Sequence, residues 1–290
     1  MRKSITLILL VLLVGPALWS AAHPAGAQGG GNSDVTHLVL GIEGNAQEAV
    51  FNRLEWDFDA FVPLTPGTSL RANDYMEMPS GTTVWILCAD LEIQSQSSVG
   101  VPPCSEYPEQ TAFSFPDDPT WQPGDEPDGG GTTDLSGAVN TINGLSVEDD
   151  VKAFALAALL RNNGQTADAI EQLTALPELG CQRPGAVRVP DEAEYPLVQS
   201  PTLYLRLGEL YEISGDSETA KRYYGCARTL ADGLNDPATT ALAAAREANA
   251  SEIGDAIPLY QIAINNYQAI GAVDYVEEMV SYCGRDCTTN

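Results

Sequence analysis

The sequence predicts a multidomain protein with α and β parts: a small antiparallel β barrel or sandwich followed by a domain of α-helical hairpin repeats. Residues 35–115 alternate in polarity and are rich in Val, Ile, Thr, Phe and Trp, which is typical of short strands. Residues 116–146 are rich in Pro, Gly and Asp, which favour neither helix nor sheet. Residues 147–290 are rich in Ala and Leu with a helical period. The three regions therefore predict a β domain, an acidic linker and a helical domain.

Residues 1–27 have the pattern of a secretory signal peptide. Arg2 and Lys3 form a basic start, an apolar run follows from Ile5 to Leu13, and residues 25–27 (Ala-Gly-Ala) form a small-residue cleavage site. A retained membrane anchor needs about 20 apolar residues, whereas Pro16 interrupts this run. We therefore expect a chain that is secreted or extracytoplasmic, in the periplasm or on the cell surface, without a membrane span after cleavage.

The composition is strongly acidic, with 40 Asp and Glu against 14 Lys and Arg and a net charge of −26. Binding to nucleic acid or anionic lipid depends on Lys and Arg, so both are disfavoured as partners. Beyond the predicted signal peptide there is one histidine, His37, and no zinc-binding spacing of Cys or His. The sequence therefore predicts a non-enzymatic protein without metal or cofactor. His37 opens an apolar run, Val35 to Ile42, and is interpreted as an ordinary edge-strand residue.

Several short strand-like runs make up the first region: His37 to Ile42, Gln47 to Leu54, Phe61 to Leu64, Tyr75 to Met78, Thr83 to Cys88 and Leu91 to Ile93. Between residues 35 and 95, the order of Gly44, Pro66-Gly67, Asn73-Asp74 and the turn at residues 79–81 resembles a FecR-like extracytoplasmic domain. Residues 88–90 depart from the Asp-Gly turn that is common in that family. The resemblance implies a β-rich, non-catalytic module that senses or docks to components of a bacterial envelope.

The linker prediction rests on the prolines, glycines and carboxylates of residues 116–131. A calcium loop of the EF-hand type is the alternative, but its order of Asp, Asn and Gly with a terminal Glu is absent. The composition therefore predicts two domains that move independently. Trp121 is unusual in a free tether, and we expect it to attach the linker to a neighbouring element.

The helical region contains a more specific pattern between residues 201 and 234. Small residues at Gly208 and Ala220 allow two antiparallel helices to approach closely, and Ser200-Pro201 is a helix start. The pattern resembles a hairpin of the tetratricopeptide repeat (TPR), whose period is 34 residues. The residues at matching offsets are Tyr204, Leu207, Gly208, Tyr211, Gly215, Ala220, Tyr224 and Ala227.

Two further segments fit the same register, residues 150–177 and 257–283, and an Ala-rich helix from Pro237 to Asn249 precedes the second of them. An ordinary helical bundle is the alternative to TPR-like hairpins. Insertions such as Leu179 to Gln199 must separate the hairpins, because the loop glycines are 51 and 56 residues apart instead of 34. These glycines are Gly164, Gly215 and Gly271.

The TPR resemblance implies a stack of hairpins whose first helices form a concave face that binds a protein or peptide. The side chains expected there are mixed polar and apolar and lack a Lys and Arg cluster, so a partner with a neutral or basic segment is favoured. They are Phe154, Arg161, Asn162, Leu205, Glu209, Glu212, Gln261, Asn265 and Gln268.

All six cysteines lie beyond the predicted signal peptide, in a chain expected in an oxidising compartment. Six cysteines allow 15 pairings, so region and spacing must choose among them. We expect no free thiol. The expected pairs are Cys88 with Cys104 in the β domain, Cys283 with Cys287 one helical turn apart, and Cys181 with Cys226.

Two classes of function follow from these observations. The favoured one is an exported, non-enzymatic adaptor or scaffold in which the β module and the helical repeats each hold a partner. The alternative is a carbohydrate-active or carbohydrate-binding extracellular protein whose partner is a cell-envelope glycan. Carboxylates such as Asp57, Asp59 or Asp90 would then act beside Trp56 or Trp85.

Overall fold

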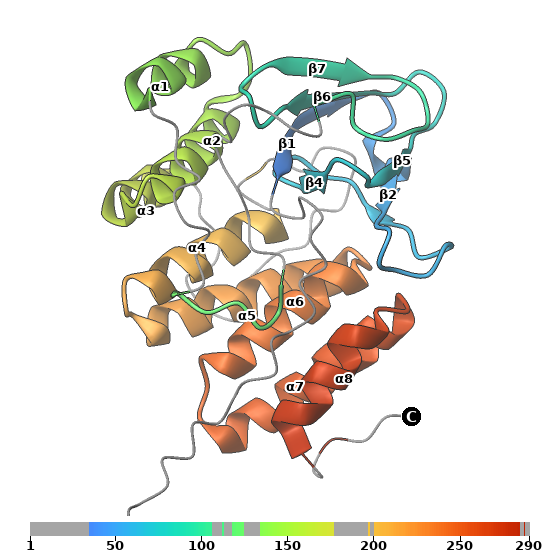
Figure 1. The fold of residues 1–290 in the computed structure, drawn as a ribbon, viewed down its shortest axis with the longest axis vertical. Coiled ribbons are helices and arrows are strands. Elements are labelled where there is room, and N and C mark those ends of the chain that lie inside the picture. The colour runs from blue at the N-terminus through green and yellow to red at the C-terminus, as the bar shows by residue number, and fades with distance from the viewer. Residues whose placement is uncertain are drawn as a thin grey trace, which may run out of the picture. The chain divides into compact units, whose positions relative to one another are not determined.

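A computed structural model describes residues 35–105, 112, 118–124, 134–176, 197, 200–284 and 287. These residues belong to one compact unit, Asn32–Asn290, and the predicted signal peptide lies outside them. In the described residues all β-strands precede the α-helices, so the predicted order of a β part and an α part is confirmed (Figure 1). None of the described helices is both long and apolar enough to cross a bilayer.

The strands form two antiparallel sheets. The first has the order β4-β1-β6-β7 and the second the order β3-β2-β5. The strands of the second sheet pair with one another and not with the first sheet, so the described strands do not close into the predicted barrel. The strands are β1 (Thr36–Glu43), β2 (Val50–Asn52), β3 (Val62–Pro63), β4 (Ser69–Arg71), β5 (Tyr75–Glu77), β6 (Thr83–Leu87) and β7 (Ile93–Gln96).

Eight α-helices follow in the described part of the chain. They are α1 (Leu135–Asn143), α2 (Asp149–Asn162), α3 (Thr166–Thr174), α4 (Pro201–Ile213), α5 (Ser217–Gly233), α6 (Pro237–Asn249), α7 (Ile253–Ala269) and α8 (Val273–Cys283). Consecutive helices pack against each other from α1 to α8, and α4 also touches α6. Helix α1 lies within residues 116–146, the range predicted as linker.

Local sequence signals set the ends of these helices. The Ser200 side chain accepts a hydrogen bond from the main chain of Thr202, and Pro201 occupies the first turn of α4, as the sequence predicts. The three loop glycines at the ends of α2, α4 and α7 all have positive φ, between 69° and 84°. Positive φ is strained for residues with a Cβ atom, which explains the glycines at these turns.

The two helices predicted within residues 257–283 pack on each other, and the helix that precedes them packs more closely than the sequence pattern indicated. The sequence pattern paired residues 257–283 as a hairpin, which corresponds to α7 and α8, and treated Pro237–Asn249 as an intervening helix. In the structure this helix, α6, packs closely on both α5 and α7. Its short side chains make this close packing possible, because Ala241, Ala243, Ala244 and Ala245 are fully buried. Helix α6 is therefore the partner of α7 and the neighbour of α4.

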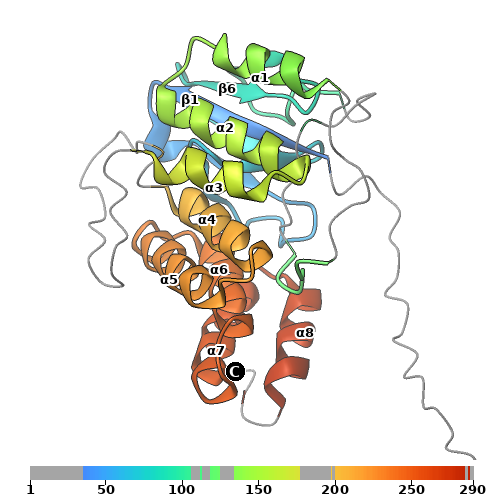
Figure 2. The same cartoon turned by 90° about the vertical axis from the view of Figure 1, so that its left-hand side faces the viewer.

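β1 joins the sheets to the helices. Leu38 and Leu40 belong to a hydrophobic cluster with α1, α2 and α4, whereas Val39 belongs to a second cluster with the second sheet, α6 and α7. Alternate residues of a strand point to opposite faces, so β1 is covered on both sides. Figure 2 shows α1 and α2 across one face of the first sheet. The shared clusters argue against the predicted independent motion of the β and α parts.

Two of the expected disulfides are confirmed. Cys88 is bonded to Cys104 with a Cα–Cα distance of 5.5 Å, and Cys283 to Cys287 with 5.6 Å. Cys226 is also disulfide-bonded, and its expected partner Cys181 lies outside the described residues.

We expect labelling of the denatured, unreduced protein to find no free thiol, because none of the described cysteines is free. Reduction before labelling should expose six thiols, which is the control for complete labelling. A stoichiometric free thiol at Cys226 in the unreduced protein would contradict the expected pairing.

The contact between α4 and α5 predicts a strong effect of Gly208→Ala. A Cβ atom on Gly208 would lie 2.5 Å from the ring of Tyr224, which is buried. We expect the free energy of unfolding to fall by about 1–3 kcal/mol, because the closely packed helices must move apart. Chemical denaturation measures this change. Gly254→Ala in α7 is the matched control, since its Cβ meets no atom within 4 Å, and equal losses in both variants would refute the close approach.

Candidate binding face of the helices

The predicted concave-face residues divide into two groups. Those on α2 and α4 lie near one another, whereas Gln261, Asn265 and Gln268 lie on α7. The Gln261 Nε2 atom donates to Asn265 Oδ1 over 3.0 Å within that helix. Gln261, Asn265 and Gln268 were assigned to the concave face because the sequence pattern makes α7 the first helix of the last hairpin. In the structure α7 packs on both α6 and α8, and its three residues lie on a different helix from the first group.

Four of the predicted face residues are buried, and the prediction that they are free for a partner is wrong. Phe154, Arg161, Leu205 and Glu209 are 1%, 5%, 5% and 3% exposed. The sequence pattern assumed that nothing in the chain covers the first helices. In the structure the Trp121 ring lies against Arg161, and Ser69 of the β part contacts Arg206 on α4. Asn162 and Glu212 keep partial exposure.

A buried ionic network links α2 to α4. Arg161 Nε lies 2.6 Å from Glu209 Oε1, and Arg206 Nη1 lies 3.0 Å from Glu209 Oε2. Arg206 also donates to Ser69 Oγ in the first sheet over 3.3 Å. One carboxylate therefore pairs with two guanidinium groups, and this buried arrangement fixes the two helices and the sheet relative to each other.

Residues 118–124, which we call the strap, lie against α6. Arg246 donates from Nη1 to the main-chain oxygen of Trp121 and from Nη2 to that of Asp118, both over 2.7 Å. Asn249 Nδ2 donates to the oxygen of Pro119 over 3.1 Å. Figure 2 shows the strap as a short green segment on the side of the helices away from α5. The strap is thus held through its main-chain carbonyl groups.

The indole ring of Trp121 anchors the strap. Its centroid lies 4.7 Å from Arg246 Cζ and 5.6 Å from Arg161 Cζ, and the residue is buried. Such cation–π contacts contribute roughly 0.5–2 kcal/mol each. The expectation that Trp121 attaches this region to a neighbouring element is therefore confirmed.

The same face contains an arginine cluster that the sequence analysis missed. Arg161, Arg206 and Arg246 come from α2, α4 and α6, and Arg161 and Arg246 both contact the strap. Arg246 was overlooked because α6 had been treated as an intervening helix. Its position in the last turn of an otherwise Ala-rich helix was the available signal.

Glu212 completes the charged side of this face. Tyr224 Oη donates to Glu212 Oε2 over 2.6 Å. Burial raises the pKa of the Glu212 carboxyl, while the hydrogen bond from Tyr224 and the charge of Arg246 oppose this rise. Asn162 Nδ2 donates to the main-chain oxygen of Ala112 over 3.3 Å, which is another contact with a carbonyl group. The arrangement can therefore hold a polypeptide segment by its main chain and one aromatic ring.

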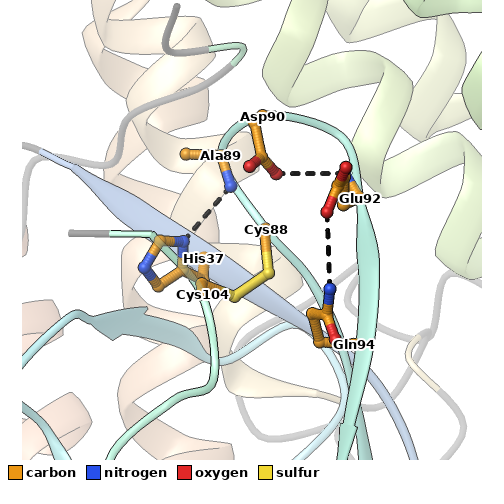
Figure 3. The surroundings of a disulfide bond; sticks show 7 residues. All are labelled: His37, Cys88, Ala89, Asp90, Glu92, Gln94 and Cys104. Carbon is orange, nitrogen blue, oxygen red and sulfur yellow. Dashed lines mark hydrogen bonds between the residues drawn. A yellow bond between two sulfur atoms is a disulfide. The ribbon is translucent and has the colours of Figure 1, made fainter. Parts of the chain in front are cut away.

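The residues considered for catalysis do not form a corresponding site. His37 lies on β1 between β4 and β6, so its interpretation as an edge-strand residue is wrong. Its Nδ1 atom accepts a hydrogen bond from the main chain of Ala89 over 3.2 Å, beside the Cys88–Cys104 disulfide (Figure 3). Burial lowers the pKa of His37 to about 4, although Asp90 opposes this shift. The imidazole is thus neutral and enclosed at pH 7.

A hollow lies between the β part and the helices. It is a cavity of about 70 Å³ whose aromatic lining includes Phe51, Trp56, Tyr267 and Tyr275. Among its described lining residues, none is one of the three aspartates considered for carbohydrate chemistry. Two of these lie in the loop after β2, and the third, Asp90, lies after β6.

No family model, no curated protein and no solved structure matches this chain.

The raised pKa of Glu212 predicts a pH-dependent effect of Glu212→Gln. Glutamine keeps an acceptor for Tyr224 but carries no charge. A carboxyl whose pKa is higher in the folded than in the unfolded protein stabilises the folded state at pH values below its unfolded-state pKa. This stabilisation is lost as the pH rises through its folded-state pKa. The free energy of unfolding of the variant, relative to that of the wild type, should therefore increase from pH 4 to pH 7. Chemical denaturation at both values tests this, and a difference independent of pH would refute it.

Proposed function

We propose that this protein is an exported, non-enzymatic adaptor that binds a short segment of a partner protein on the face formed by α2, α4 and α6. In this proposal the helical part consists of TPR-like hairpins, and the β part is a FecR-like module that senses or docks to envelope components. The observation that supports it most is the strap, since side chains of α6 and α2 hold a polypeptide segment from another part of the chain.

The contacts with the strap are of a kind that a partner could also make. Main-chain carbonyl groups occur in every polypeptide, so Arg246 and Asn249 can donate hydrogen bonds to segments of many different sequences. The planar guanidinium group presents its donors in a rigid fork, which suits two carbonyl groups at once. The face is also preorganised, because Glu209 already pairs with Arg161 and Arg206 within the chain.

Export is supported by two independent features. The first 27 residues have the signal pattern, and the disulfides at Cys88–Cys104 and Cys283–Cys287 fit an oxidising compartment. The net charge of −26 favours a partner that is neutral or basic as a whole.

Glycan binding is the second candidate, and the aromatic lining of the cavity near Trp56 favours it. However, pockets that enclose small-molecule ligands usually have volumes of about 300–1,000 Å³. The cavity of about 70 Å³ is much smaller, so it suits a single side chain or small group better than a sugar ring. The volume therefore favours the adaptor over the glycan-binding protein.

A photo-crosslinking experiment tests the proposed function. Benzoylphenylalanine is introduced at Asn162 or Asn249 on the proposed face, and at exposed Asn265 on α7 as the matched control. In cells that export the chain, we expect covalent adducts with a partner protein from the first two positions and none from the third. Adducts from Asn265 alone, or equally from all three positions, would contradict the assignment of this face.

A further inference from the structure

The face proposed for partner binding is already occupied in this structure. The strap covers α6 and reaches α2 through Trp121. We propose that the strap is an internal ligand that competes with the partner, and that the partner supplies a proline-containing turn with an aromatic side chain. This inference rests on the proposed function.

The conformation of the strap defines the class of ligand. Asp118 Oδ1 accepts hydrogen bonds from the main chain and the hydroxyl of Thr120, over 2.8 and 2.7 Å. The main-chain nitrogen of Trp121 donates to the oxygen of Asp118 over 3.3 Å, which closes a four-residue turn. Asp at the first and Pro at the second position are typical of such turns. The turn directs its carbonyl groups to Arg246 and Asn249 and its ring to the guanidinium groups.

One polar group of the strap has no partner on this face. The indole Nε1 of Trp121 is buried and has no hydrogen-bond acceptor within the described part of the chain. A buried donor without an acceptor loses the free energy of its hydrogen bond with water. A partner with Phe at this position would avoid that loss, and one with Trp and a nearby acceptor would recover it. The strap is therefore a ligand that a better-matched segment can displace.

Charge also restricts the segment that fits. The face brings together three guanidinium groups, from Arg161, Arg206 and Arg246, and the carboxylates of Glu209 and Glu212. Its local charge is thus positive although the whole chain is strongly acidic. A neutral or weakly acidic turn, such as Asp-Pro-Thr-Trp of the strap, matches this local charge. The partner as a whole can still be neutral or basic.

Covalent attachment explains why the strap would compete effectively. A tethered segment has an effective concentration in the millimolar range when its linker is short. A free peptide with the same contacts therefore binds weakly while the strap is in place. Weakening the strap should reveal the intrinsic affinity of the face.

The experiment uses a fluorescein-labelled peptide with the sequence of residues 116–124, Pro-Asp-Asp-Pro-Thr-Trp-Gln-Pro-Gly, and the full chain. Fluorescence anisotropy should show binding to the Trp121→Ala chain at least about 10-fold tighter than to the wild type, because the competing anchor is gone. Trp121→Phe is the matched control, since it keeps an aromatic ring and should bind the peptide as weakly as the wild type. The same peptide with Ala in place of Trp should not bind.

A second variant covers the case in which Trp121→Ala does not fold. The Asp118 side chain is exposed, and its hydrogen bonds to Thr120 lie within the turn, so Asp118→Ala should loosen the strap without removing a packed side chain from the helices. It should also increase peptide binding, by a smaller factor. Equal binding to wild type and both variants, or no binding to any of them, would overturn the inference. If adducts at Asn162 persist in that case, the proposed function survives and the strap is only structural.

Discussion

The burial of β1 on both faces is the constraint on which the rest of this structure depends. Leu38 and Leu40 pack on the first helices, while Val39 packs toward the second sheet and the later helices. Neither part of the chain can cover its apolar surface alone, because each hydrophobic cluster contains residues from both. The inner surfaces of α2 and α4 are consequently enclosed by their own chain, and in the described part of the structure Phe154, Leu205 and Glu209 do not line an open face.

Enclosure of these helices places charged groups in the interior, where each one needs a partner. Arg53, just after β2, pairs with Asp74, just before β5, over 3.0 Å, and Glu209 pairs with Arg206 on its own helix and with Arg161 on α2. Removing one member of a buried pair typically costs about 3–5 kcal/mol, since the other charge is left uncompensated. These pairs therefore specify one arrangement of sheet and helices. Arg246 differs, because it donates to main-chain carbonyl groups of the strap.

This difference connects the architecture to the proposed function. A face that is fixed by internal ion pairs is rigid, and a polar contact made to main-chain carbonyl groups can be exchanged for the same contact with another polypeptide. The strap comes from the region of the sequence that is richest in Pro, Gly and Asp. Its composition favours neither helix nor sheet, and Trp121 is its main anchor. Both features are expected for a segment that occupies a binding face in competition with a partner.

The sequence by itself determined the features that depend on neighbours along the chain. The start of α4 at Ser200-Pro201, the turn glycines, the close approach at Gly208 and the pair Cys283–Cys287 all follow from local geometry or short spacing. Tertiary structure alone decided which surfaces are covered. The enclosure of α4 and the position of the strap depend on packing between segments far apart in the chain, since Arg206 contacts Ser69, 137 positions away, and Arg246 contacts Trp121, 125 positions away. Periodicity shows that a helix has two faces, but the segment that packs on each face is selected by the total surface buried, which no single segment encodes.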